Sequence, residues 1–278
     1  MLASSNQAFP SSRLIFGSAS LIGAVNNVTP PSFPPVNMDG CLYDFQSPLE
    51  ILDITDPHWH QGTLNGGFHA FRALNLKPEV IQTLLDISEF SQALEIGLGR
   101  PIDKGLITPL LDSRSHLLYR LLSLPISVGE VLVQTPGIPS DENSEQVSPL
   151  YACARLAAQL YSLHVILPVP RTADVRQILL PQIMTQVSAM DKGMATNEAS
   201  LQLTAWACMV AAIASSADSD EINNNSMEKW FARHLAVAAA RLGIFGYGEM
   251  REVLQLFGWV NAACDKHGTI IWHTRWNE

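Results

Sequence analysis

Histidine and aspartate side chains gather near residue 60 in an arrangement that could bind a metal ion. The run Asp56-Pro-His58-Trp-His60 is followed nine residues later by His69. In an extended segment, side chains two residues apart point to the same side, so His58 and His60 could share a metal with His69 or Asp56 as third ligand. The segment is also rich in Gly and Asn, where exposed imidazoles are common. We favour a polar loop and expect neither a metal nor another cofactor.

Further polar residues on amphipathic segments are candidates for acid–base chemistry. A polar side chain that a helix directs into an apolar pocket has a shifted pKa and can donate or accept a proton. The alternative for each is a half-exposed or hydrogen-bonded structural residue, and we favour it. The sequence assigns no residue a catalytic role. The candidates are Glu89, His116, Tyr119 and His164.

Nucleophile and phosphate-binding motifs are missing from the sequence. There is no G-x-S-x-G, and the four cysteines are far apart with no C-x-x-C. Cys153 and Cys208 stand among Ala, Leu and Met, which predicts small core residues. The acidic run at 217–221 is the nearest approach to an aspartate-rich magnesium motif, and its Asn and Ser neighbours predict a solvated loop.

Composition limits the function classes that the chain can serve. Its 278 residues include 47% hydrophobic and 15% charged ones, a balance typical of a packed globule rather than a disordered chain. The formal net charge of −9 repels a phosphate backbone, so we expect no direct nucleic-acid binding. No apolar run reaches the roughly 18 residues that a transmembrane helix needs, and we expect no membrane partner.

The first 38 residues carry a single basic residue, Arg13, and no acidic one. The apolar run 14–25 resembles a weak signal-peptide core, and a transit peptide is a second alternative. The single Arg, set 13 residues in, argues against both. We interpret residues 1–38 as a poorly ordered leader rich in Pro and Ser.

Residues 39–278 are predicted to form one all-α domain. Apolar positions recur at helical spacing, and Pro, Gly and polar clusters separate the segments. The segment at 198–215 is apolar on all sides, which indicates a central buried helix, and Ser226 is predicted to cap the helix after a loop at 215–226. Most aromatic residues beyond 200 are expected in the core. The predicted helices span about 78–94, 109–124, from 149 to a stop at 167–170, from 172 with a kink or break at Pro181, 198–215, 226–242 and 247–260, with weak strand signals at 130–134 and 269–272.

Several of these segments, taken in order, resemble the fungal-specific transcription factor domain. This domain is the regulatory region that follows a binuclear zinc-cluster DNA-binding module. The resemblance covers about residues 40–278, and it depends on the order and spacing of pieces that are individually ordinary amphipathic helices. The pieces are residues 117–124, 151–161 with 167–170, the helix of Trp206, 229–231, 242–244, 249–254, 257–259 and 263–265, ending near Trp272.

The sequence also departs from the family pattern. Family members carry an N-terminal array of six cysteines that binds two zinc ions, and this sequence has no such array. In the helix of Tyr151 the family has a Cys directly before the Arg, whereas here Ala154 precedes Arg155 and the Cys is one position earlier. Arg120 and Arg155 are expected to pair with acidic residues of the helical array, without a partner that the sequence identifies.

The resemblance implies a transcription regulator or co-regulator without its own DNA-binding module, for example of a fungal secondary-metabolite gene cluster. It implies a nuclear protein, with the cytoplasm as alternative, that acts through a DNA-binding factor or the transcription machinery. A small-molecule effector, a dimeric state and an upstream zinc-cluster exon are left open.

Two other classes of function compete with the regulator. One is a cluster-encoded enzyme, a cyclase or isomerase, or a small-molecule binding protein that reuses the helical fold. The other is a heterodimerisation module, which predicts a large apolar surface patch.

Overall fold

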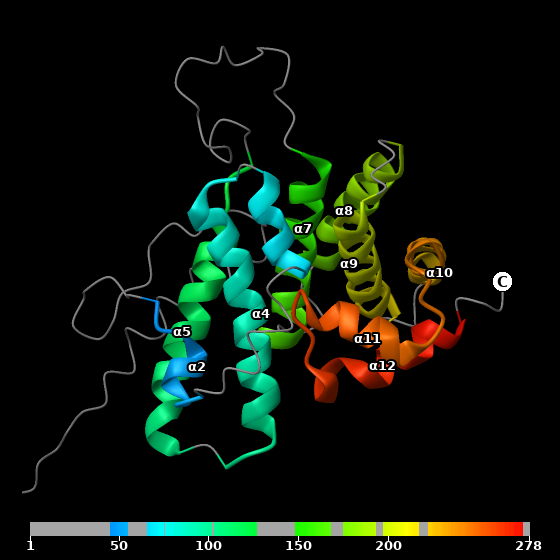
Figure 1. Cartoon of the computed structure of the whole chain (residues 1–278). Coiled ribbons are helices and arrows are strands. Elements are labelled where there is room, and N and C mark those ends of the chain that lie inside the picture. The colour runs from blue at the N-terminus through cyan, green and yellow to red at the C-terminus, as the bar shows by residue number, and fades with distance from the viewer. Residues whose placement is uncertain are drawn as a thin grey trace, which may run out of the picture.

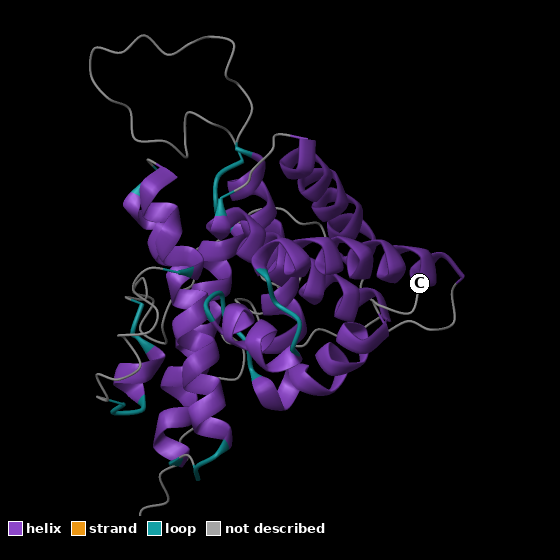
Figure 2. Cartoon of the chain, turned by 45° about the vertical axis from the view of Figure 1, so that its right-hand side comes forward, coloured by secondary structure: helices purple, strands orange, loops and turns teal. Residues whose placement is uncertain are grey.

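The structure is a computed structural model that describes residues 45–54, 66–74, 76–101, 103–126, 148–167, 175–192, 197–216 and 222–274. Most of these residues are helical, and none lies in a strand (Figure 2). The prediction of an all-α fold is therefore confirmed. The elements are α2 (Pro48–Ile51), the 3₁₀ helix η1 (Gly67–Leu74), α4 (Pro78–Leu98), α5 (Lys104–Leu122), α7 (Pro149–Tyr161), the π-helix η2 (Ser162–Ile166), α8 (Val175–Lys192), α9 (Glu198–Ser216), α10 (Ile222–Leu242), α11 (Tyr247–Gln255) and α12 (Asn261–Thr274).

The helices pack around one hydrophobic core. α4 and α5 lie side by side, and the short α2 contacts both (Figure 1). α7 packs against α5, α8 and α9, while α10, α11 and α12 all contact α9. Buried side chains from η1 to α12 belong to a single core cluster. Segments distant in sequence therefore share one folding unit.

α9 is the central helix, as its sequence predicts. Every residue from Ser200 to Ser215 is buried. Contrary to the expectation that no segment is long enough, this helix could cross a bilayer by length and composition, although one such helix is weak evidence of a span. In its apolar window 83% is buried inside the fold, and buried core helices pass the same test. Its apolar surface is thus accounted for by contacts with the other helices.

An aromatic cluster joins α9 to η1, α7 and the residues after α11. The Trp206 ring lies 5.5 Å from Phe68, 5.4 Å from Phe257 and 5.9 Å from Tyr161 between ring centroids. All four side chains are buried, and Trp206 Nε1 donates to the Gly258 carbonyl at 3.1 Å. The expectation that late aromatic residues form core is confirmed for Trp206 and Phe257.

Several helix ends follow from local sequence signals. α4 and α7 begin at Pro78 and Pro149, where a first-turn proline needs no hydrogen-bond donor. Ser148 occupies the N-cap position of α7, but its side chain makes no capping hydrogen bond. Gly243 follows α10 with a φ of 71°, the left-handed conformation that ends helices.

Two prolines lie inside helices instead of at their boundaries. α5 begins at Lys104 rather than near Pro109, because Asp103 caps it by accepting from the Gly105 amide at 2.9 Å. Pro109 then falls in the second turn. α8 continues from Val175 to Lys192 through Pro181, so of the two predicted alternatives, a kink or a break, the break is wrong. The predicted start at Thr172 lies outside the described residues.

The C-terminal boundaries differ most from prediction. α10 starts at Ile222, so Ser226 lies within the helix and does not cap it. α11 ends at Gln255, and α12 includes the predicted strand 269–272. The strand prediction at 269–272 is wrong: the consecutive apolar residues Ile270, Ile271 and Trp272 lie on a helix, with Ile271 and Trp272 buried. Glu95 accepts a hydrogen bond from the first amide of this helix. The strand signal at 130–134 and the leader 1–38 lie outside the described residues.

Candidate functional site

Residues 45–47 lie against α4 and α5 and bring several candidate side chains together. The Phe45 ring lies 5.9 Å from the His116 ring and 5.3 Å from the Arg120 guanidinium, measured to the ring centroid of Phe45. Ser113 Oγ donates to the Gln46 carbonyl at 2.8 Å. The segment is therefore fixed to α5 by ring contacts and a hydrogen bond.

The side of α4 that faces this segment carries two carboxylates. Glu89 accepts a hydrogen bond from Ser47 Oγ, and Asp86 forms an ion pair with Arg120 of α5. Gln82 Nε2 also donates to Asp86 Oδ1, at 2.8 Å. We call the polar set formed by Gln82, Asp86, Glu89, His116 and Arg120 the α4–α5 polar cluster.

Asp86 is the most deeply buried charge of this cluster, at 1% exposed. Burial raises the pKa of its carboxyl group, and this effect outweighs the opposing influence of Arg120 and the hydrogen bond from Gln82. The expected pairing of Arg120 with an acidic residue is thus found, with a partner 34 positions earlier in the chain.

The structure places two of the four acid–base candidates against residues 45–47. Glu89 and His116 both contact residues 45–47, through Ser47 and Phe45 respectively. Tyr119 is a partly buried residue of α5 packed against the core, and His164 lies in η2, which follows α7. The arrangement holds residues 45–47 between two helices, and this is the structural role that the sequence favours.

The predicted metal ligands fall mostly outside the described part of the chain. Asp56, His58 and His60 lie there, while His69 is partly buried in η1. Within the described ranges, no group of three His, Cys, Asp or Glu side chains has a metal-binding arrangement.

Three of the four cysteines are free thiols in the core. Cys153 and Cys208 are fully buried, as predicted, and Cys264 is 3% exposed. Burial raises the pKa of Cys153 and Cys264 to about 12, and that of Cys208 also rises. A nucleophilic cysteine needs a lowered pKa and access to solvent, so these thiols have the properties of structural residues.

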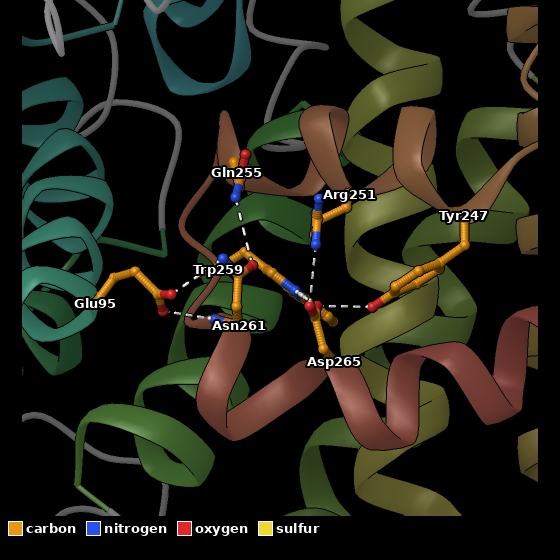
Figure 3. Close-up of polar contacts among 7 residues, drawn as sticks. All are labelled: Glu95, Tyr247, Arg251, Gln255, Trp259, Asn261 and Asp265. Carbon is orange, nitrogen blue, oxygen red and sulfur yellow. Dashed lines mark hydrogen bonds and ion pairs between the residues drawn. The ribbon is translucent and has the colours of Figure 1, made fainter. Parts of the chain in front are cut away.

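A second polar network, which the sequence did not reveal, is centred on Asp265 of α12 (Figure 3). Its Oδ1 accepts from Trp259 Nε1 at 2.8 Å and from Tyr247 Oη at 2.9 Å. Arg251 Nη1 lies 3.4 Å from Oδ2. Burial and the Asp265 carboxylate raise the pKa of Tyr247, which therefore stays a neutral donor. We call these four residues the Asp265 network.

Hydrogen bonds connect the first residue of α12, next to the Asp265 network, to α4. Glu95 accepts from the Asn261 backbone amide at 2.7 Å and from Asn261 Nδ2 at 3.0 Å (Figure 3). A carboxylate at a helix N-terminus compensates both its unpaired amides and its dipole. The two residues are 166 positions apart, so no local sequence signal could have identified the contact.

The close approach of the Tyr247 and Trp259 side chains to Gly268 of α12 makes the Asp265 network possible. A Cβ atom on Gly268 would lie 2.7 Å from Tyr247 Oη and 3.0 Å from Trp259 Cζ2. Only glycine permits this approach without displacement. The spacing of Trp259, Asp265 and Gly268 could have indicated the Asp265 network only if the start of α12 at Asn261 had been predicted. The sequence did not reveal that start.

Comparisons with known proteins add no family. No family model and no curated protein matches the sequence, and no solved structure matches the fold.

Proposed function

We propose that this protein is a transcription regulator or co-regulator that acts through protein partners, without a DNA-binding module of its own in this sequence. The observation that carries the proposal is the joint packing of the segments that resemble the fungal regulatory domain. The residues of these segments that belong to one core cluster are Tyr151 of α7, Trp206 of α9, Phe231 of α10, Cys264 of α12, and Trp259 between α11 and α12. Segments recognised separately in the sequence thus form one array.

The charge of the protein supports action through partners. At −9, the chain has no long-range attraction for a nucleic-acid backbone. A regulator of this kind is recruited to a promoter by a DNA-binding factor, in the nucleus. We propose genes of a fungal secondary-metabolite cluster as its targets, which rests on the family resemblance alone.

A reporter assay in the source organism tests the regulatory role. The full chain is fused to an unrelated DNA-binding domain whose site stands upstream of a reporter gene. We expect a severalfold change in reporter transcript relative to the DNA-binding domain alone. A matched fusion carrying Gly67→Ala, which we expect to destabilise the fold, should give a smaller change. Equal transcript levels for the intact fusion and the bare DNA-binding domain would contradict the proposal.

The competing function is an enzyme, a cyclase or isomerase, encoded in the same secondary-metabolite gene cluster. The observation that favours it is the α4–α5 polar cluster, which brings Glu89 and His116 to one segment. In a strain carrying Glu89→Gln and His116→Asn, an enzyme would accumulate its substrate while transcripts stay unchanged. If the protein is a regulator, no substrate accumulates in this strain while transcripts stay unchanged.

A further inference from the structure

A row of polar side chains runs along a buried face of α7 and ends at the start of η2. Tyr151, Arg155, Gln159 and Ser162 are spaced four, four and three residues apart, which places them on one side of the helix. Their exposed fractions are 0%, 8%, 2% and 0%. We call this row the α7 polar stripe.

The stripe faces the C-terminal end of α5. Tyr151 Oη donates to the Pro125 carbonyl at 2.9 Å, and Gln159 Nε2 donates to the Leu121 carbonyl at 3.4 Å. Arg155 lies between these two residues on the same face. A cation near the carboxyl end of a helix is favoured by the helix dipole, but that end carries no full negative charge.

The stripe carries polar groups that its surroundings leave unsatisfied. Arg155 forms no hydrogen bond or ion pair with the residues that the structure describes, although Arg120 on α5 has Asp86. Gln159 Oε1 and Ser162 Oγ are buried without a hydrogen-bond partner. Burial lowers the pKa of Arg155, and the group that opposes this is Tyr151, a neutral phenol whose own pKa is raised.

A buried charge without a partner in the fold destabilises the protein. Such a charge is retained where a bound group compensates it. The α7 polar stripe also ends where the helix widens into the π-helical turn of η2. Such turns occur often at functional sites. The cation, the unsatisfied polar atoms and the π-turn are independent observations that point to one position in the fold.

We propose that the α7 polar stripe binds a small hydroxycarboxylate. The planar guanidinium of Arg155 is suited to two parallel hydrogen bonds with a carboxylate. Gln159 Oε1 needs a donor, and Ser162 Oγ can donate or accept, so a hydroxyl group on the same molecule has the chemistry to pair with either atom. The 8% exposed fraction of Arg155 leaves it a contact with solvent. This inference gives the proposed regulator an effector class.

Thermal melting of the purified full chain tests the inference, with glycolate, lactate and citrate as probes at matched ionic strength. Acetate, which lacks the hydroxyl group, is the reference. A ligand that binds only the folded state raises the melting temperature with its concentration until the site is saturated. We expect a saturable rise with at least one hydroxycarboxylate, with an apparent affinity several times that for acetate.

Variants locate the site. Arg155→Met should abolish the rise, and Gln159→Leu should reduce the preference for the hydroxycarboxylate over acetate. Arg233→Met, at an exposed position of α10, should leave both unchanged. If Arg155→Met does not fold, Arg155→Lys keeps the charge but loses the paired geometry, and should weaken binding about tenfold. An equal rise in Arg155→Met and wild type, or no saturable rise with any probe, would overturn the proposal.

The chain itself is the other source of carboxylates, through Asp141, Glu142 and Glu145. The triple amide variant of these residues distinguishes the two sources. If it destabilises the wild type but not Arg155→Met, an internal carboxylate occupies Arg155 and the ligand site is disproved. If it leaves stability and the melting rise unchanged, the free ligand is supported. Thermal melting does not depend on transcription, so the ligand site can be disproved while the reporter assay still supports the regulatory role. Equally, a negative reporter assay leaves the melting result for the ligand site unchanged.

Discussion

Single side chains in this protein are placed mainly by burial, and the thiols are the clearest case. The apolar neighbours of Cys153 and Cys208 were enough to predict their burial from the sequence. The partner of Arg120 could not be predicted in the same way. Asp86 lies on α4, which carries three other acidic residues, so only the packing of α4 on α5 selects it.

Buried thiols give stability a defined dependence on alkaline pH. Unfolded cysteine has a pKa near 9, and burial raises that of Cys153 to about 12. The folded state therefore keeps a proton that the unfolded chain releases, so this stability is present below pH 9 and is lost as pH rises toward 12. We expect the stability difference between wild type and Cys153→Ala to shrink by about 1 kcal/mol from pH 7 to pH 10. Urea unfolding measures it, and a constant difference would contradict the assignment.

At the scale of helices and their contacts, local sequence signals predicted which helices exist better than they predicted where each helix begins and ends. The uniformly apolar sequence of α9 identified the central helix directly. The start of α12 was missed because its cap comes from Glu95, far away on α4. The Asp265 network was missed for the same reason, since its donors meet only when α11 and α12 pack together.

The junction of η1 with the end of α11 depends on one glycine. Gly67 has a φ of 61°, and a Cβ atom there would lie 2.0 Å from the Leu256 carbonyl oxygen. We expect Gly67→Ala to lower the free energy of unfolding by about 3 kcal/mol, through strain and displaced backbone. Gly248→Ala is the matched control, because a Cβ atom meets nothing within 4 Å at this position in α11. It should raise stability by about 0.5 kcal/mol. Equal effects in urea titrations would disprove the contact.

Asp265 is expected to stabilise the packing of α11 on α12. Asp265→Ala leaves the Tyr247 hydroxyl and Trp259 Nε1 without their acceptor, which should cost about 2–3 kcal/mol. Lys266→Ala changes the next, exposed residue and should stay within about 0.5 kcal/mol of wild type. Urea unfolding followed by tryptophan fluorescence measures both variants. A similar small loss for the two would show that the network does not hold these helices together.

At the scale of the whole molecule, the all-α class followed from hydrophobic periodicity. The joint packing of the recognised segments did not, because it depends on contacts between residues far apart in the chain. Function was the least predictable property. Its candidate residues divide between the α4–α5 polar cluster, other positions in α5, η1 and η2, and positions outside the described residues. The proposed role depends on the array as a whole.

Deletion of the gene in its host tests the regulatory role most directly, with transcripts of neighbouring genes and accumulated metabolites measured in the same cultures. If the protein is a regulator, neighbouring transcripts fall severalfold and the corresponding products disappear together. Reintroduction of the intact gene should restore both, whereas reintroduction of the destabilised Gly67→Ala gene should restore them less fully. Unchanged transcripts together with accumulation of a single pathway intermediate would contradict the regulatory role and identify an enzyme instead.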